Sequence, residues 1–227
     1  MKLLVLRPEP GAGATAARAR ALGLEPVVAP LFEIRPVGPG PVDAAAFDAL
    51  LLTSANAARH APDGHSSLRV FAVGEASADA ARARGFTEVN VGPSDAAAAV
   101  EAMARSGVKR ALHLCGRDHL AVAHPGLGIE RRIVYAAEPV DVPAGALAGP
   151  AVAMVHSARA AERLAGLAPD RGAIALAAIS EAAAEAAGEG WSAKRVAAAP
   201  RDEALLELAA ELCNSGGAQA EDAERGL

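Results

Sequence analysis

The chain has 227 residues and a net charge of −5, and although 52% of its residues are hydrophobic, only 3% are aromatic. Nucleic-acid-binding proteins usually carry a basic surface, and those that bind single strands add stacking rings, so this composition argues against nucleic acid as a partner. No stretch reaches the roughly 18 apolar residues of a membrane span, and the first apolar run breaks at Arg7-Pro8, too early for a signal peptide. Because Cys115 and Cys213 show no metal or redox spacing, we expect free thiols in a cytoplasmic protein that does not bind a membrane.

Short apolar runs alternate along the chain with Ala- and Arg-rich stretches of helical character. In the first half the runs predict strands at residues 3–6, 26–29, 49–52, 70–73 and 89–91. Small polar residues that follow a strand mark helix starts, at Ser54, Ser77, Ser94 with Asp95, Ser157, Ser180 and Asp202. The alternation predicts an α/β fold with parallel sheets covered by helices. Residues 213–227 are Gly-rich and then charged, without periodicity, so we expect a disordered tail.

Residues 2–105 and 109–212 follow one pattern twice. An apolar run ends at Thr53-Ser54-Ala55-Asn56-Ala57 in the first half and at His156-Ser157-Ala158-Arg159-Ala160 in the second. A period of about 105 residues is too long for a solenoid, so we predict an internal duplication that gives two similar domains with a cleft between them. Helices begin at the carboxyl edge of an open parallel sheet, so their polar starts would face that cleft and suit several anionic groups.

Some individual residues allow a plain interpretation as well as a functional one. Arg7 follows the first strand, where a surface arginine and an anion contact both fit the sequence. Tyr135 ends the run 132–135, where a half-buried plug and a reactive phenol both fit. The histidines between residues 113 and 124 follow no zinc pattern, and the glycine run at 11–16 matches the dinucleotide fingerprint only weakly.

One ordered series of short motifs runs through both halves of the chain. It consists of Leu6-Arg7-Pro8, Pro30-Leu31-Phe32-Glu33-Ile34, Leu51-Leu52-Thr53-Ser54-Ala55-Asn56-Ala57, Ala72-Val73-Gly74-Glu75-Ala76-Ser77-Ala78, Val134-Tyr135 and Ser157-Ala158-Arg159-Ala160. This series resembles the uroporphyrinogen-III synthase family over residues 2 to about 212. The resemblance depends on the order and spacing of the motifs, because each motif alone is short.

The resemblance implies two flavodoxin-like α/β domains joined by a two-stranded linker. Residues 1–33 with 140–212 would form one discontinuous domain, and residues 39–132 would form the other. The linker would be residues 34–38 and 133–139, and residues 213–227 would be the tail. The duplication alone would divide the chain near residue 107.

The resemblance also implies an enzyme, a cyclising hydro-lyase of tetrapyrrole biosynthesis that supplies haem, corrins or chlorophyll. It would convert hydroxymethylbilane, a polycarboxylate, into uroporphyrinogen III, inverting ring D through a spiro intermediate without metal or cofactor. We expect a monomer and leave open a transient contact with the preceding enzyme of the pathway. The rival interpretation from the residues is a cytoplasmic two-domain clamshell that binds an anionic metabolite without catalysis.

The resemblance assigns site residues one by one. Tyr135 would be catalytic, and the substrate would contact Arg7, Thr53, Ser54, Ser77, Ser157 and Ser180. One departure concerns Ile179-Ser180-Glu181-Ala182-Ala183, where many members carry threonines. Either Ser180 replaces their hydroxyls or the backbone alone makes that contact, and Glu181 would be unfavourable near a polycarboxylate unless it points away.

Overall fold

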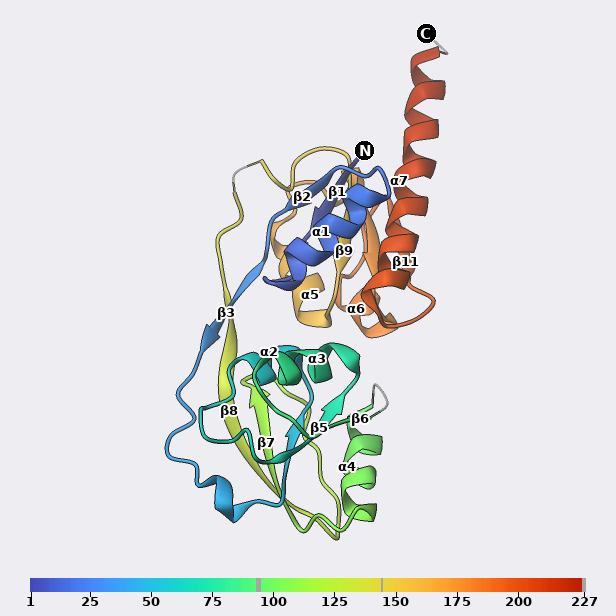
Figure 1. The fold of residues 1–227 in the computed structure, drawn as a ribbon. Helices are drawn as coiled ribbons and strands as arrows, with labels where there is room; N and C mark the ends of the chain where they lie inside the picture. Colours follow the sequence, from blue (N-terminus) through green and yellow to red (C-terminus); the bar gives the residue numbers. More distant parts are fainter. Residues whose placement is uncertain (93–94, 144, 226–227) are drawn as a thin grey trace. The chain divides into compact units, whose positions relative to one another are not determined.

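The computed structural model describes residues 1–92, 95–143 and 145–225 of the chain (Figure 1). The chain separates into two compact units, Met1–Glu33 with Pro139–Leu227, and Ile34–Glu138. We call these unit 1 and unit 2 and describe each by itself. No helix within the described residues is long and apolar enough to cross a membrane.

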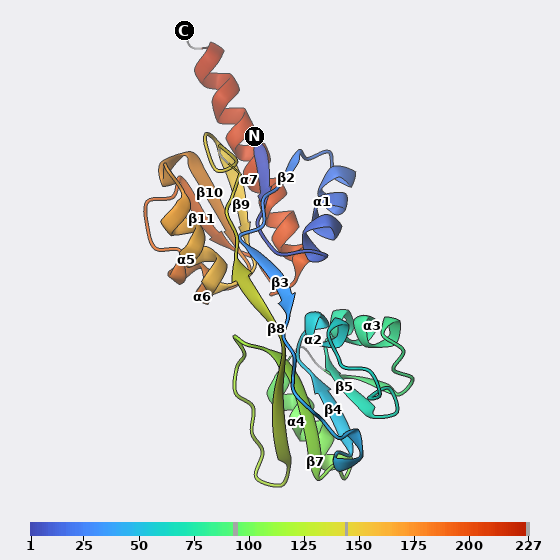
Figure 2. The ribbon, with the colours of Figure 1, turned by 90° about the vertical axis from the view of Figure 1, so that its left-hand side faces the viewer.

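Unit 1 contains a five-stranded sheet in the order β11-β10-β9-β1-β2, in which every pairing is parallel. The strands are β1 (Lys2–Val5), β2 (Pro26–Val28), β9 (Ala151–Val155), β10 (Ile174–Ala178) and β11 (Ala193–Val196). The helices are α1 (Gly11–Ala21), α5 (Ala158–Leu167), α6 (Glu181–Ala186) and α7 (Asp202–Arg225), with a 3₁₀ turn η2 at Arg171–Ala173. Parallel strands need crossover connections, and here these cover both faces: Figure 2 shows α5 and α6 on one side of the sheet and α1 and α7 on the other.

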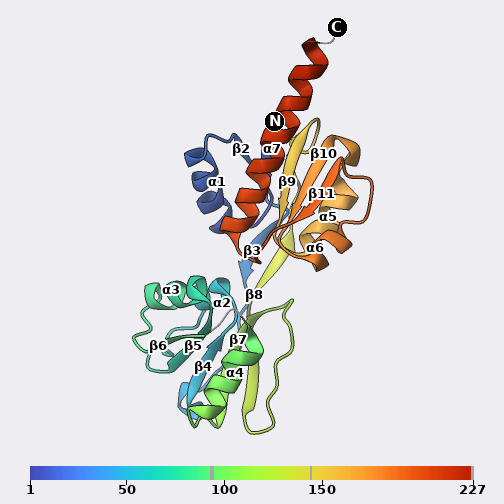
Figure 3. The same ribbon diagram turned by 90° about the vertical axis from the view of Figure 1, so that its right-hand side faces the viewer.

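Burial on both faces explains why the central strands of unit 1 are continuous apolar runs. All five residues of β9 and all five of β10 are buried. Leu3, Val152 and Met154 form one core cluster with Leu205 and Ala209 of α7. Figure 3 shows α7 lying along this face of its sheet. The described buried members of this cluster are aliphatic side chains, Met154 and Cys213, without an aromatic ring.

Unit 2 contains a six-stranded sheet in the order β3-β8-β7-β4-β5-β6. The strands are β3 (Phe32–Pro36), β4 (Ala49–Leu52), β5 (Arg69–Val73), β6 (Val89–Gly92), β7 (Arg110–Gly116) and β8 (Gly128–Pro139). The pairings from β6 to β8 are parallel. The helices are α2 (Ala55–Arg59), α3 (Glu75–Ala83) and α4 (Ala96–Arg105), with a 3₁₀ turn η1 at Ala44–Ala46.

The alternation of side chains along β4 divides the core of unit 2 into two layers. Leu50 and Leu52 belong to the cluster that contains α2 and α3, whereas Ala49 and Leu51 belong to the cluster that contains α4. The strand β4 is therefore buried on both faces, and its carboxyl end leads directly into α2. This placement fixes Thr53 and Ser54, which follow β4 directly.

The α/β fold with parallel sheets that the sequence predicts is confirmed. The five strands predicted in the first half match β1, β2, β4, β5 and β6 to within one residue at each end. Four of the predicted helix starts are N-caps whose side chains accept backbone hydrogen bonds: Ser54, Asp95, Ser157 and Ser180. Ser94 lies outside the described residues.

Three sequence expectations differ from the structure. Ser77 does not begin a helix, because Gly74 with a φ of 75° is the N-cap and places Ser77 inside the first turn of α3. Asp202 is the first residue of α7 rather than the residue before it. The expected disordered tail is helical as far as Arg225, since its alanines, glutamates and Gln219 favour helix and outweigh the glycines at 216 and 217.

Candidate functional site

A cavity of 430 Å³ opens at the carboxyl ends of β4 and β7 in unit 2. It lies where helices α2 and α4 begin, the edge at which parallel sheets usually bind ligands. We call it the Tyr135 pocket. The described residues that line it are Thr53, Ser54, Val73, Asp95, Ala96, Gly116, Asp118, His119, Leu120 and Tyr135.

Ser54 holds one wall of the pocket in a fixed conformation. Its backbone is extended, and its Oγ accepts hydrogen bonds from the backbone N–H groups of Asn56 at 3.1 Å and Ala57 at 3.3 Å. The same oxygen lies 3.0 Å from Tyr135 Oη. A hydroxyl has two lone pairs and one proton, and both lone pairs of Ser54 already accept N–H groups. Ser54 therefore donates its proton to Tyr135 Oη, and the phenol proton is left to donate elsewhere.

Tyr135 lies on β8, and its ring passes over Gly116 at the end of β7. A Cβ atom on residue 116 would lie 2.6 Å from Tyr135 Cζ, so only glycine leaves room for the ring. The pairing of β7 with β8 shifts register between Cys115 and Gly116 at this point. Burial raises the pKa of the Tyr135 phenol, and the hydrogen bond with Ser54 opposes the rise only in part. Tyr135 is therefore a neutral hydrogen-bond donor at neutral pH.

His113, on β7, stands behind Thr53 and is completely buried. Its Nε2 atom lies 3.0 Å from Thr53 Oγ1. Burial, with smaller electrostatic contributions from the neighbouring His119 and Arg131, lowers the pKa of His113 to about 4, so the imidazole is neutral at neutral pH. His119 donates from Nδ1 to the Gly116 carbonyl oxygen at 2.9 Å, which holds its ring at the pocket wall.

The charges that line the Tyr135 pocket are negative. Asp95 and Asp118 contribute carboxylates, and no lysine or arginine lies among the described residues of the lining. Asp95 also caps α4, because its Oδ1 accepts the backbone N–H of Ala97 at 3.0 Å. The pocket thus combines three hydroxyl groups with two carboxylates, an arrangement suited to hydrogen-bond donors and to developing positive charge.

Arg7 lies in unit 1, in a cluster centred on Asp202. Arg7 Nη1 lies 2.9 Å and His156 Nε2 lies 2.6 Å from Asp202 Oδ1, while Arg18 and the Thr15 hydroxyl also bind this carboxylate. Burial alone would raise the pKa of Asp202, but the hydrogen bonds from His156, Arg18 and Thr15 hold it well below its ordinary value. Burial lowers the pKa of His156, so a neutral imidazole donates Nε2–H to the carboxylate. Two guanidinium groups against one carboxylate leave the cluster with a net positive charge.

The remaining predicted residues differ in how accessible they are. Ser157 and Ser180 cap α5 and α6, and each Oγ accepts the backbone N–H three residues further on, at 3.2 and 3.3 Å. Ser157 is exposed and Ser180 is partly exposed. Ser77 is only 4% exposed inside α3, which argues against the substrate contact expected of it. The structure therefore brings together Thr53, Ser54 and Tyr135, whereas Arg7, Ser157 and Ser180 belong to the other unit.

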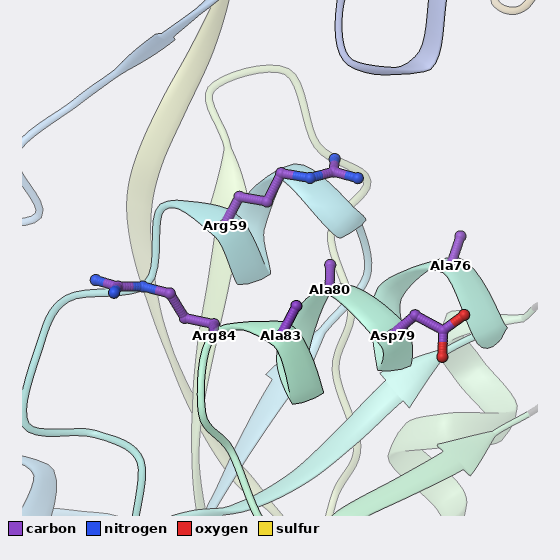
Figure 4. A pocket seen from close by; sticks show the side chains of 6 residues that line it. All are labelled: Arg59, Ala76, Asp79, Ala80, Ala83 and Arg84. Carbon is purple, nitrogen blue, oxygen red and sulfur yellow. The ribbon is translucent and has the colours of Figure 1, made fainter. Parts of the chain in front are cut away.

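A second cavity of 510 Å³ lies between α2 and α3, over a floor of alanines (Figure 4). Its two arginines extend in opposite directions in that view. Arg59 donates to Asn56 Oδ1, and Arg84 donates to the Ala61 carbonyl oxygen and to Asp63. Its described lining is Arg59, Ala76, Asp79, Ala80, Ala83 and Arg84, and these side chains do not converge on one point as those around Tyr135 do.

Sequence reasoning missed several residues of these sites. Gly116 is the last residue of the buried strand β7, and Asp118 follows that strand closely, as Thr53 and Ser54 follow β4. Position at the end of a buried strand is therefore the sequence signal that could have indicated them. His113 enters the sequence argument only as a possible metal ligand, and within the described residues no group of three His, Cys, Asp or Glu side chains gathers as a metal site would require. The sequence marks Asp202 only as a helix start, and nothing local indicates its partners near residues 7 to 18 and at 156.

One family model and several solved structures match this chain. A family model described as uroporphyrinogen-III synthase HemD matches residues 13–207. A solved uroporphyrinogen-III synthetase from Helicobacter pylori is similar with a TM-score of 0.66 and 16% identity, over 93% of this chain and 100% of that chain. A mutant uroporphyrinogen III synthase from Thermus thermophilus is similar with a TM-score of 0.51 and 19% identity, over 91% and 96%. A search of curated proteins found no match.

Proposed function

The chain belongs to the uroporphyrinogen-III synthase family, and we propose that its Tyr135 pocket binds the pyrrole ring that carries the hydroxymethyl group of the substrate. The family consists of cyclising lyases of tetrapyrrole biosynthesis whose substrate is hydroxymethylbilane and whose product is uroporphyrinogen III. The observation that supports this role of the pocket is the neutral Tyr135 phenol, hydrogen-bonded to a helix-capping serine and surrounded by hydroxyls and carboxylates.

The first step breaks the C–O bond of the hydroxymethyl arm. The electron pair of that bond leaves with the oxygen, which takes a proton from the Tyr135 hydroxyl and departs as water, while the pyrrole nitrogen supplies electrons to form a positively charged azafulvenium. The electron-rich pyrrole drives this loss itself, so a neutral phenol with an ordinary pKa of about 10 suffices as the donor and no metal is needed. The substituted carbon of ring D then attacks to form a spiro intermediate, which fragments and closes again with ring D inverted. The proton that ring D loses on closure restores the Tyr135 phenol.

The charge of the pocket supports placing a pyrrole there rather than a carboxylate arm. Positive charge develops on the ring nitrogen as the hydroxyl leaves, and Asp95 and Asp118 lie in the lining to stabilise it. A carboxylate arm in the same pocket would meet these two negative charges without a lysine or arginine among the described lining residues. The phenol proton, which Ser54 leaves free, would then be directed to the departing hydroxyl oxygen.

We assign the anionic arms of the substrate to other groups. The cluster that contains Arg7 has a net positive charge, which supports binding of a substrate carboxylate arm at that edge of unit 1. The Asp202 carboxylate neutralises one of the two guanidinium charges. The hydroxyls of Ser157 and Ser180 accept backbone N–H groups of their helices through oxygen lone pairs. Each hydroxyl proton is therefore still available to donate to the substrate. In unit 2 the Thr53 hydroxyl is the proposed direct contact, whereas Ser54, expected to touch the substrate, donates its proton to Tyr135 and so acts through the phenol.

The test of this assignment is Tyr135→Phe, assayed with enzymatically made hydroxymethylbilane and chromatography that separates isomers I and III. The ring and its packing remain, so we expect kcat for isomer III to fall by about 10 to 1000 fold with little change in Tm. Ser54→Ala is the companion variant: it removes a helix cap and the hydrogen bond that orients the phenol but keeps the phenol itself, so stability should fall by about 1 kcal/mol and kcat by less than in Tyr135→Phe. Full isomer III formation by Tyr135→Phe would mean that the tyrosine only fills space.

The same assay separates the enzyme from a non-catalytic clamshell. A protein that only binds an anionic metabolite would leave hydroxymethylbilane to close without inversion, giving isomer I alone. A catalyst that positions the chain ends yields isomer III.

We also retain the finer fold proposals of two flavodoxin-like domains related by duplication, a two-stranded linker and a cleft. The duplication is supported by two matching segments, in which a fully buried strand leads to an extended serine that caps the next helix: β4 to Ser54, and β9 to Ser157. A monomer in the cytoplasm, with a transient contact to the preceding enzyme left open, stays a prediction that sedimentation and fractionation can test.

A further inference from the structure

Buried His113 lies directly behind Thr53 of the Tyr135 pocket, and the proposed reaction does not use it. It is 0% exposed, and Nε2 is hydrogen-bonded to Thr53 Oγ1 at 3.0 Å. Its other ring nitrogen, Nδ1, is buried and has no hydrogen-bond partner among the described residues. The His119 ring stands edge-on at 6.1 Å between centroids, so the imidazole is fixed by packing on that side too.

These contacts decide which nitrogen carries the proton. If Nδ1 carried it, a buried N–H donor would be left without an acceptor, and such orphaned donors are rare in folded proteins. If Nε2 carries the proton, its N–H donates to Thr53 Oγ1, and only the Nδ1 lone pair is left without a hydrogen-bond donor among the described residues. The partner of one ring nitrogen thus sets the tautomer, and the tautomer sets the direction of the hydrogen bond.

We propose that His113 is a positioning residue that makes the Thr53 hydroxyl a hydrogen-bond donor into the Tyr135 pocket. Thr53 Oγ1 accepts from His113 and lies in the pocket lining, so its own proton is directed away from His113 toward bound substrate. The acceptor is an oxygen of the substrate. Ser54 does the same for Tyr135 by a separate route, so the pocket presents two oriented O–H donors rather than two freely rotating hydroxyls.

This inference rests on the proposed function for the role of the pocket, but its first test does not involve catalysis. Nitrogen-15 NMR of the imidazole in the wild-type protein distinguishes protonated from unprotonated ring nitrogens. We expect the resonance of His113 to show a neutral ring with the proton on Nε2. A proton on Nδ1, or a ring that is charged at neutral pH, would overturn the proposal.

The second test is a double-mutant cycle on KM. We expect His113→Leu and Thr53→Val each to raise KM for hydroxymethylbilane by about five- to tenfold with kcat nearly unchanged, and the double variant to be no worse than either single one. His113→Gln should recover most of the wild-type KM, because its amide N–H can take the place of Nε2–H.

A matched control is available in the same unit. His65 is also buried, at 4% exposed, with one ring nitrogen on the Asp63 carbonyl oxygen and the other without a partner among the described residues, yet it does not line the pocket. His65→Leu should lower Tm without changing KM. If His113→Leu behaves in the same way, or if its effect on KM adds fully to that of Thr53→Val, the role of His113 is structural only. Because Tyr135→Phe acts on kcat, its failure and the failure of this proposal are distinguishable.

Discussion

At the scale of single residues, the sign of the charge in the Tyr135 pocket limits what the pocket can bind. Asp95 is partly committed to capping α4, whereas Asp118 follows Gly116 in the loop after β7 and is exposed. A carboxylate at this place raises the pKa of the Tyr135 phenol further, after burial has raised it most, and so keeps the phenol protonated. The same charge favours a cation and disfavours an anion in the pocket.

Asp118→Asn tests whether the pocket holds the pyrrole ring that becomes positively charged or a carboxylate arm of the substrate. If the pocket holds the pyrrole on which positive charge develops, kcat should fall by about three- to tenfold with KM little changed, because an exposed charge acts through solvent. If a carboxylate arm lies there instead, the substitution removes a repulsion and KM should fall. Asp170→Asn, an exposed aspartate in unit 1, is the control that should change neither constant. Steady-state kinetics at low and high salt distinguish the outcomes.

At the scale of elements, the strand-to-helix turns were predictable and their long-range partners were not. The serines and Asp95 that cap α2, α4, α5 and α6 are recognisable because a small polar residue follows an apolar run. Tyr135 is indicated by the family resemblance, whereas its neighbour Gly116 depends on the packing of β7 against β8, which local sequence does not encode. The lack of periodicity after residue 213 predicts disorder, yet intrinsic helix propensity alone extends α7 through this segment.

Gly116→Ala tests how the ends of β7 and β8 position the phenol. The new methyl group would meet the Tyr135 ring at 2.6 to 2.8 Å, so the ring must move and the hydrogen bond from Ser54 should be lost. We expect a cost of about 1 to 3 kcal/mol in unfolding free energy and a loss of kcat comparable with that of Tyr135→Phe. Gly38→Ala, where a Cβ meets open space, should change neither. Unaltered kinetics in Gly116→Ala would show that the ring is free to shift without consequence.

At the scale of the whole molecule, the family, the enzyme class and the α/β architecture that the sequence indicates are confirmed. The sequence did not indicate which ionisable groups the fold withdraws from solvent. His113 is buried in the sheet of unit 2, and the pair His156 and Asp202 is partly buried at the sheet edge of unit 1. Each of these groups has a lowered pKa in the folded protein, so each makes folding sensitive to acid.

The last prediction follows from the signs of these shifts. Between pH 6.5 and about 4 the unfolded chain binds a proton at His113 and the folded protein does not, so stability falls as the pH is lowered through this range. A shift of the pKa from 6.5 to about 4 corresponds to about 3 kcal/mol for one buried imidazole. The lowered pKa of His156 acts in the same direction. Below the ordinary pKa of 3.8, Asp202 adds a second loss, because its carboxylate must be protonated away from its partners.

Urea denaturation at intervals from pH 7.5 to 3 measures both losses. His113→Gln carries no titrating ring and should flatten the upper part of the curve, between pH 6.5 and 4, while leaving the part below pH 4 unchanged. Asp202→Asn should do the reverse, lowering stability near neutral pH and removing the steeper loss below pH 4, because its amide cannot hold two guanidinium groups. A wild-type curve that stays level down to pH 4 would mean that His113 is protonated in the folded protein. Nε2–H would then still donate to Thr53 Oγ1, but the His113 imidazolium would place a positive charge behind the pocket.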